Sequence, residues 1–166
     1  MKNLILLIIA FISIPIIGQD LKTVKTSDYE ISYPSNFRYD DSKTRGTEFI
    51  IYIEKEDEKD TFIENINLLI QNLKEYQIDL NQYIEITEKQ INENGILIES
   101  KRIVLNNSDV HVLTYEANLN VRNLKFHQYI LVKNEKAYIL TYSAKIEKFD
   151  FFFPEILEIF NSFSLK

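Results

Sequence analysis

Between residues 95 and 144, hydrophobic and polar positions alternate in four successive runs that are rich in β-branched and aromatic residues. The runs cover residues 96–105, 110–118, 124–133 and 137–144. Polar stretches at residues 106–109 and 134–136 separate them in the way that tight turns separate antiparallel strands. The pattern therefore predicts a four-stranded antiparallel meander.

The first half of the chain carries shorter strand patterns. Tyr29, Ile31 and Tyr33 alternate with polar residues and predict a half-buried strand. This strand ends at proline 34, because proline cannot donate a hydrogen bond to a ladder.

Two further strands are predicted at residues 48–54 and 65–71, although the apolar spacing across residues 63–73 also fits a helix. Residues 21–26 fit either a short strand or a tether, and residues 40–46 fit a loop.

Two helices, each with one apolar face, are predicted before and after the meander. For the first helix, Asp79 and Gln82 form a capping-box pattern, and Asn94 with Gly95 predicts a left-handed cap at its end. Its apolar face consists of Leu80, Tyr83, Ile84, Thr87 and Ile91. The second helix carries a stripe of Phe149, Phe152, Phe153, Ile156, Phe160 and Phe163, with Pro154 in its first turn.

Both faces of the meander are apolar. Leu113 and Tyr115 point away from Val112, and Ile130 points away from Tyr129, because side chains alternate along a strand. A sheet that is apolar on both faces must be covered on both faces. The sequence therefore predicts an α+β fold, a three-layer α/β/α sandwich with a central antiparallel sheet, in a single domain over residues 19–166.

The first eighteen residues follow the pattern of a secretory signal peptide. Lys2 precedes an apolar run over residues 4–17, and the small residue Gly18 comes just before polarity begins. The run of 14 residues is shorter than the roughly 20 that a helix needs to span a bilayer. We therefore expect cleavage near Gly18, rather than a retained anchor, and export to the periplasm or medium without stable membrane insertion.

Composition and charge narrow the choice of partner. The chain has no cysteine, so neither a disulfide nor a lipid-modified cysteine is available. Without the leader it carries 18 basic and 25 acidic residues, a net charge of −7, which disfavours nucleic acid and anionic lipid. Acidic rather than basic residues flank the phenylalanine stripe, so we interpret it as core rather than as a membrane-surface helix. We expect a monomer.

Acidic residues offer candidate cation sites but lack the patterns that such sites require. Residues 54–60 are seven consecutive charged residues, but they lack the alternate ligand spacing and the glycine of a calcium loop. We interpret this run as a solvated loop or hairpin. The pairs Asp40 with Asp41 and Glu85 with Glu88 show no contrast of environment of the kind that acid and base roles need. We predict no metal site and no cofactor.

Nucleophilic catalysis has few candidate residues in this sequence. Without cysteine, it would need a serine or threonine with His111 or His127 as the base. If the strands pair through a turn near residue 120, His111 lies opposite residues 129–131, so the two histidines do not share a zinc site. We interpret each histidine as a polar side chain on a sheet face, and we predict no catalytic or cofactor-binding residue.

Several short stretches resemble the Mog1/PsbP/DcrB superfamily. Residues 29–37 (YEISYPSNF) are similar to its entry strand, and residues 64–70 (ENINLLI) are similar to its asparagine-flanked strand, which supports a strand there. The helix pattern at residues 80–91 and the ending Phe-Asn-Ser-Phe at residues 160–163 also resemble the family. The sequence departs from it at Asn36, where glycine is common, and at Phe37, where tryptophan is common.

The resemblance implies a function as well as a fold. Members of this superfamily are mostly non-catalytic accessory or binding proteins, and no functional residue of the family matches a position in this chain. We therefore expect an exported, non-catalytic protein that binds a protein partner. Two alternatives stay open, a carrier with an apolar cavity between the sheet and the phenylalanine-rich helix, and an envelope hydrolase with an unrecognised site.

Overall fold

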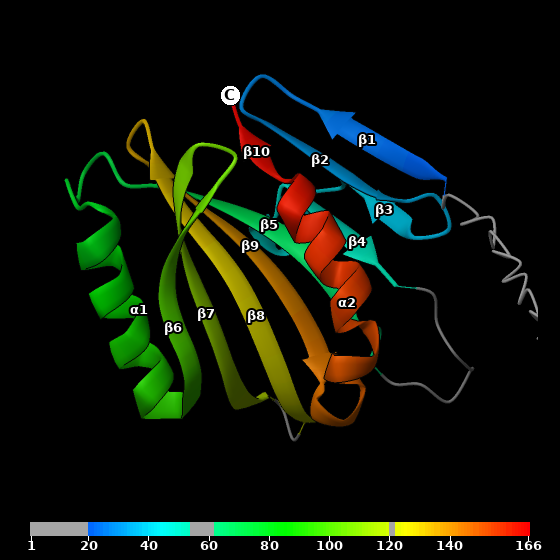
Figure 1. Ribbon diagram of the computed structural model, residues 1–166. Coiled ribbons are helices and arrows are strands. Elements are labelled where there is room, and N and C mark those ends of the chain that lie inside the picture. The colour runs from blue at the N-terminus through cyan, green and yellow to red at the C-terminus, as the bar shows by residue number, and fades with distance from the viewer. Residues whose placement is uncertain (1–19, 54–61, 120–121) are drawn as a thin grey trace, which may run out of the picture.

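Seven antiparallel strands form one continuous sheet in the computed structural model, which describes residues 20–53, 62–119 and 122–166 (Figure 1). In spatial order they are β3 (Arg38–Asp40), β4 (Phe49–Tyr52), β5 (Asn65–Asn72), β9 (Lys136–Lys145), β8 (Arg122–Lys133), β7 (Ser108–Leu119) and β6 (Gly95–Leu105). The predicted meander is β6 to β9, and the predicted strand at residues 65–71 is β5. The polar loop at residues 40–46 ends in a short 3-10 turn, Thr44–Gly46.

Tight turns set the register of the meander. Asn106 and Asn107 join β6 to β7, and Asn134 and Glu135 join β8 to β9, with φ between 49° and 61° at all four positions. Two consecutive residues of positive φ form the turn type whose twist matches that of paired strands. β7 and β8 pair with His111 opposite residue 130, as predicted.

The structure also has a second, smaller sheet, which the sequence patterns did not predict. It consists of β1 (Leu21–Lys25), β2 (Tyr29–Pro34) and β10 (Ser164–Leu165), with β2 in the middle. The first segment is therefore a strand and not a tether. Pro34 ends β2 as predicted, because its nitrogen has no hydrogen to donate.

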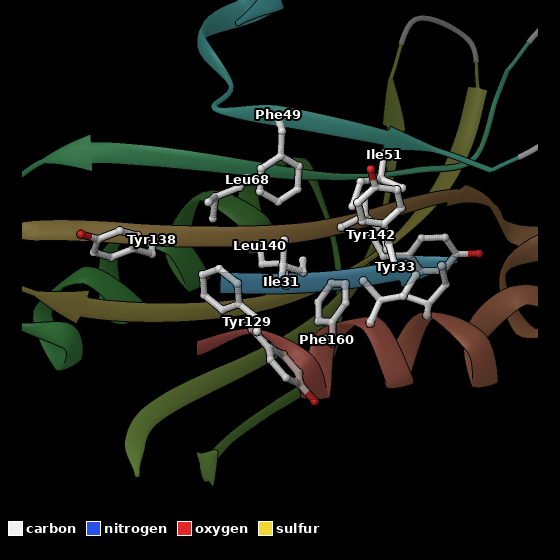
Figure 2. Close-up of a cluster of buried hydrophobic side chains, with 14 of the residues drawn as sticks. Ile31, Tyr33, Phe49, Ile51, Leu68, Tyr129, Tyr138, Leu140, Tyr142 and Phe160 are labelled. Carbon is white, nitrogen blue, oxygen red and sulfur yellow. The ribbon is translucent and has the colours of Figure 1, made fainter. Parts of the chain in front are cut away.

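The small sheet and α2 (Ile146–Ser162) cover one face of the large sheet. Figure 2 shows Ile31 and Tyr33 of β2 and Phe160 of α2 among side chains from β4, β5, β8 and β9. The prediction for Pro154 was wrong. The helix begins at Ile146, so Pro154 lies in its interior, where it removes one backbone hydrogen bond.

The opposite face of the large sheet is covered by α1 (Leu80–Asn94), which confirms the three-layer arrangement (Figure 1). Its core contacts come from Ile84 and Ile91, which pack on Leu113, Ile130, Ala137 and Ile139 of the sheet. The predicted capping box is present, because the Asp79 carboxylate accepts from the Gln82 amide at 2.9 Å and the Gln82 side chain accepts from the Asp79 amide at 3.0 Å.

The predicted left-handed cap at Gly95 was wrong. Gly95 is extended (φ −163°) and is the first residue of β6. A Cβ atom at this position would lie 2.2 Å from the carbonyl oxygen of Glu116 on β7. The glycine is therefore required by the close approach of two backbones and not by its own dihedral angles.

Candidate functional site

A groove runs along α1 and consists of two adjoining hollows that share Tyr83, Thr87 and Gln90. The first, here called the sheet hollow, has a volume of about 350 Å³ and lies between α1 and the large sheet. The second, the turn hollow, has a volume of about 480 Å³ and lies between α1 and residues of the segment 71–78. We call the two hollows together the α1 groove.

Aromatic and aliphatic side chains form the floor of the sheet hollow. Tyr115 of β7 and Phe126 of β8 are opposite each other in the ladder, and their rings stack with centroids 4.9 Å apart. Leu69, Ile130 and Ile139 continue the floor across the neighbouring strands. Burial raises the pKa of Tyr115 to about 12, so its hydroxyl stays neutral at physiological pH.

Three carboxamide side chains, those of Gln90, Asn94 and Gln128, also line the sheet hollow. The Gln128 amide nitrogen donates to the Thr141 hydroxyl at 3.1 Å, and the Asn94 amide nitrogen donates to the Gln90 backbone carbonyl at 2.9 Å. These bonds hold the nitrogens and leave the carbonyl oxygens of Asn94 and Gln128 as acceptors for a ligand.

A single hydrogen bond marks the boundary between the two hollows. The Tyr83 hydroxyl on α1 donates to the Gln71 side-chain oxygen on β5 at 2.6 Å. Burial raises the pKa of Tyr83, which keeps the hydroxyl protonated as a donor. The Thr87 hydroxyl donates to the Tyr83 backbone carbonyl at 2.8 Å, so the two hydroxyl groups that line both hollows are paired.

None of the described residues that line the α1 groove is charged. The two hollows are lined by twenty different residues, whereas 27% of the whole chain is charged, so about five charged residues would be expected by composition alone. A charge buried in such surroundings would have no counter-ion and would lose its hydration. The α1 groove is therefore suited to an uncharged ligand.

Another groove, of about 710 Å³, lies between α2 and the small sheet. Its lining includes the carboxylates of Glu155 and Glu158 beside Pro34, Pro154 and Ile159. Ser162, which also lines it, accepts from the Ser32 amide at 2.9 Å and donates to a backbone carbonyl of α2. This groove is larger than either hollow alone, but it lacks the aromatic floor of the α1 groove, which we therefore take as the candidate site.

The carrier hypothesis placed an apolar cavity between the sheet and α2. On that side the rings pack directly, with Phe160 edge-on to Tyr129 at 4.8 Å and Phe149 against Tyr142 at 4.9 Å. The apolar hollow lies instead on the other face of the sheet, beneath α1.

The structure brings Ser100 and His111 together, which sequence reasoning did not foresee. The Ser100 hydroxyl oxygen lies 2.7 Å from His111 Nε2 and also hydrogen-bonds to the Glu88 carboxylate of α1. Glu88 Oε1 is 4.0 Å from the same ring nitrogen. Burial and the nearby Arg102 lower the pKa of His111. The residues come from α1, β6 and β7, so spacing in the sequence gave no signal for the cluster.

The direction of these hydrogen bonds opposes nucleophilic activation. An ionised carboxylate only accepts, so Ser100 donates its single hydrogen to Glu88 and accepts from the Nε2–H of His111. A base that activates serine must instead accept the serine proton. His111 Nδ1 is buried without a hydrogen-bond partner among the described residues, so no acid orients the ring. The arrangement fastens α1 to the sheet edge.

His127 lies on the opposite face of the sheet, beneath α2. Its ring packs against Tyr129, Phe153 and Phe160, and Nδ1 is 2.9 Å from the Thr114 hydroxyl. Nε2 is buried without a hydrogen-bond partner among the described residues. Burial lowers the pKa of His127 to about 4. The observed pairing of His111 with Ile130 thus places the two histidines on separate faces of the sheet.

Of the acidic candidates, Asp40 has local hydrogen-bond partners, and the charged run lies outside the described residues. Asp40 accepts from the Ser42 amide at 3.0 Å, and hydrogen bonding to the Ser42 side chain and amide lowers the pKa of Asp40. The charged run at residues 54–60 falls outside the described part of the chain. Within residues 20–53, 62–119 and 122–166, no group of three metal-ligating side chains converges. In the same ranges no helix has the length and apolar character that crossing a membrane would require.

Comparison with solved structures identifies the fold of this chain. No profile of a known protein family matches the sequence, and neither does any curated protein. The solution structure of cyanobacterial PsbP (CyanoP) from Synechocystis superimposes with a TM-score of 0.56 at 16% identity, over 93% of this chain and 98% of CyanoP. The chain has the PsbP-like fold. This confirms, for the fold, the resemblance inferred from the sequence.

Two further structures share the PsbP-like fold with this chain. LpqN, a Mycobacterium tuberculosis protein involved in cell envelope biogenesis, has a TM-score of 0.62 at 10% identity, over 90% of this chain and 92% of LpqN. A Pseudomonas aeruginosa protein of unknown function, PA94, has a TM-score of 0.61 at 9% identity, over 86% of this chain and 94% of PA94. Identities this low establish the shared architecture and transfer no site residue.

Proposed function

We propose that this chain is an exported, non-catalytic accessory protein that binds a protein partner through the α1 groove. The observation that carries the proposal is that the groove has an aromatic floor and no charged residue in its lining, although 27% of the chain is charged. Concave apolar surfaces with a few polar groups are typical of binding sites. The PsbP-like fold shared with CyanoP and LpqN supports an accessory or binding role.

Export is proposed from the leader pattern of residues 1–18. The involvement of LpqN in the cell envelope supports the same location. N-terminal sequencing of the protein purified from its own cells tests this part. A mature N-terminus near Gly18 is expected, and an intact Met1 in the cytoplasmic fraction would overturn it.

Site-specific photo-crosslinking tests the partner-binding part. A photoreactive amino acid replaces Ile86, which lines the turn hollow and is 49% exposed. The matched control replaces Asn92, which is exposed on the same helix and lines neither hollow. Irradiation of intact cells should give a protein adduct from position 86 only. Equal adducts from both positions, or none from either, would contradict the proposal.

A second candidate function is transport of a small apolar molecule. The sheet hollow favours it, because stacked Tyr115 and Phe126 form an apolar floor of the right size for a small ligand. Native mass spectrometry of the protein purified from cells distinguishes the two functions. A discrete small-molecule adduct that is lost on unfolding would favour the carrier.

A further inference from the structure

We infer that two copies of this chain pair through their β6 strands, in antiparallel register about Ser100, and form a dimer with one continuous sheet. The inference goes beyond the proposed function, which concerns the α1 groove. It departs from the monomer expected from the sequence, because the strand order that leaves β6 at an edge is visible only in the structure. Three features of β6 carry it, namely its open backbone, its exposed apolar side chains and the order of its charges.

The two edges of the large sheet differ in length and in protection. β3 has three residues, and Arg38 and Asp40 at its two ends are charged. β6 lies at the other edge and has eleven residues without a proline (Figure 1). Short, charged edge strands resist pairing with another chain, whereas a long open edge is a template for it. β6 is therefore the edge to which a further strand can be added.

The outer backbone groups of β6 are open. The ladder with β7 uses the groups on one side of the strand. α1 reaches β6 through side chains, since the Ser100 hydroxyl donates to Glu88 and the Arg102 guanidinium donates to Asn81. Across residues 20–53, 62–119 and 122–166, no further group hydrogen-bonds to the backbone of β6. An extended polypeptide can pair with such a row of amides and carbonyls, whereas an apolar small molecule cannot.

Apolar side chains are exposed along the same edge. Ile96 is 65% exposed, Ile98 is 51% exposed and Val104 is 77% exposed. Ile98 is the extra residue of a β-bulge, because Leu97 and Glu99 pair with successive residues of β7. A strand laid along β6 would remove part of this apolar surface from water, which stabilises the association.

The ladder with β7 fixes the face of the sheet that each β6 side chain occupies. Lys101 pairs with Val112, which belongs to the core beneath α2. Glu99 is two residues away along the strand, so it points to the same face. Side chains directly opposite each other in an antiparallel pair also share a face. A two-fold axis through Ser100, perpendicular to the sheet, therefore places Glu99 of each copy opposite Lys101 of the other.

The charges favour this register over its neighbours. The Glu99 carboxylate and the Lys101 ammonium are 2.7 Å apart within one chain, so pairing about Ser100 gives an alternating group of four charges. An axis through Lys101 or Arg102 would instead place two like charges directly opposite each other, which destabilises a sheet. Charge complementarity therefore selects a second copy of the chain in one register.

Apolar side chains match in the same register. The bulge shifts the pairing by one residue, so Ile96 lies opposite Ile103 of the second copy. Ile103 already packs against the core beneath α2. The contact would cover the exposed Ile96 with a β-branched side chain, and such cross-strand pairs stabilise sheets.

Sedimentation velocity over a concentration series tests the inference on the protein purified from its own cells. Wild type should sediment as a dimer that dissociates on dilution. Glu99→Lys and Lys101→Glu should each weaken the association by at least about tenfold, because each replaces two attractive cross-strand pairs by two repulsive ones. Both side chains are largely exposed, so the variants should fold, which far-UV circular dichroism checks.

Mixing the two variants tests the register itself. Glu99→Lys makes both facing positions basic and Lys101→Glu makes both acidic, so an equimolar mixture should regain the wild-type association as a mixed dimer. The matched control reverses the charge of Lys25 or of Glu30, an exposed pair 3.0 Å apart on β1 and β2. These control variants should leave the association unchanged.

Four outcomes would overturn the inference. The first is a wild type that stays monomeric at every concentration, and the second is a dimer that neither β6 variant weakens. Equal effects of the β6 and control variants would place the contact elsewhere. A mixture that stays monomeric would show that Glu99 and Lys101 do not face each other.

Discussion

The buried imidazole of His127 should make the stability of this protein depend on pH. The ring is 4% exposed, packs against three aromatic rings beneath α2 and has a pKa lowered to about 4 by burial. An unfolded chain exposes this histidine at its ordinary pKa of 6.5. His127→Phe keeps a ring of similar size at this position and removes the titration.

The lowered pKa fixes the sign and size of the effect. Above pH 6.5 both states are neutral at this site, so stability is at its full value. Between pH 6.5 and pH 4 the unfolded chain takes up a proton that the folded chain does not bind, so stability falls as pH falls. Each pH unit costs about 1.4 kcal/mol, and the whole window costs about 3 kcal/mol.

Urea unfolding of wild type and His127→Phe across pH 7.5 to 4 measures this effect. The chain has no tryptophan, so far-UV circular dichroism is the suitable signal. Carboxylates and His111 titrate in both proteins, so the difference between the two curves isolates His127. Wild type should lose about 3 kcal/mol more than the variant on acidification. Parallel curves would show that the imidazole is solvated and that the packing of α2 over it is wrong.

Three further predictions concern packing and capping, and urea midpoints measure each. Phe160→Ala should destabilise by about 3–5 kcal/mol because the ring is fully buried, whereas exposed Glu158→Ala should change stability by less than about 0.5 kcal/mol. Gly95→Ala should cost about 1–3 kcal/mol, because its Cβ would meet the Glu116 carbonyl; an unchanged midpoint would refute that close approach. Asp79→Ala should cost about 1 kcal/mol, and no loss would mean that the capping box is not formed in solution.

Local sequence patterns predicted the secondary structure correctly wherever it depends on residues close together in the chain. The capping box at Asp79 and Gln82 and the alternation that defines β5 to β9 were all predicted. The two errors at helix ends have different causes, a close contact with a distant strand for Gly95 and an earlier helix start for Pro154. Gly95 is fixed by a carbonyl on β7, and Pro154 lies inside a helix that begins eight residues earlier.

The α1 groove could be predicted only in part. The apolar face of α1 was recognised from its spacing, but the lining also needs Leu69, Tyr115 and Gln128, which come from three other strands. Their absence of charge is a property of the assembled surface, so no window of sequence shows it. The Ser100 and His111 contact likewise arises from the pairing of β6 with β7 and the docking of α1.

By itself the sequence determined the strands, the helices and the need to cover a two-faced apolar sheet, because periodicity and capping act over a few residues. Only the tertiary structure decided that β1, β2 and β10 form a separate sheet beside α2 and that the open apolar surface lies under α1. Those features depend on contacts between residues far apart in the chain, whose geometry is set by packing and not by local preference.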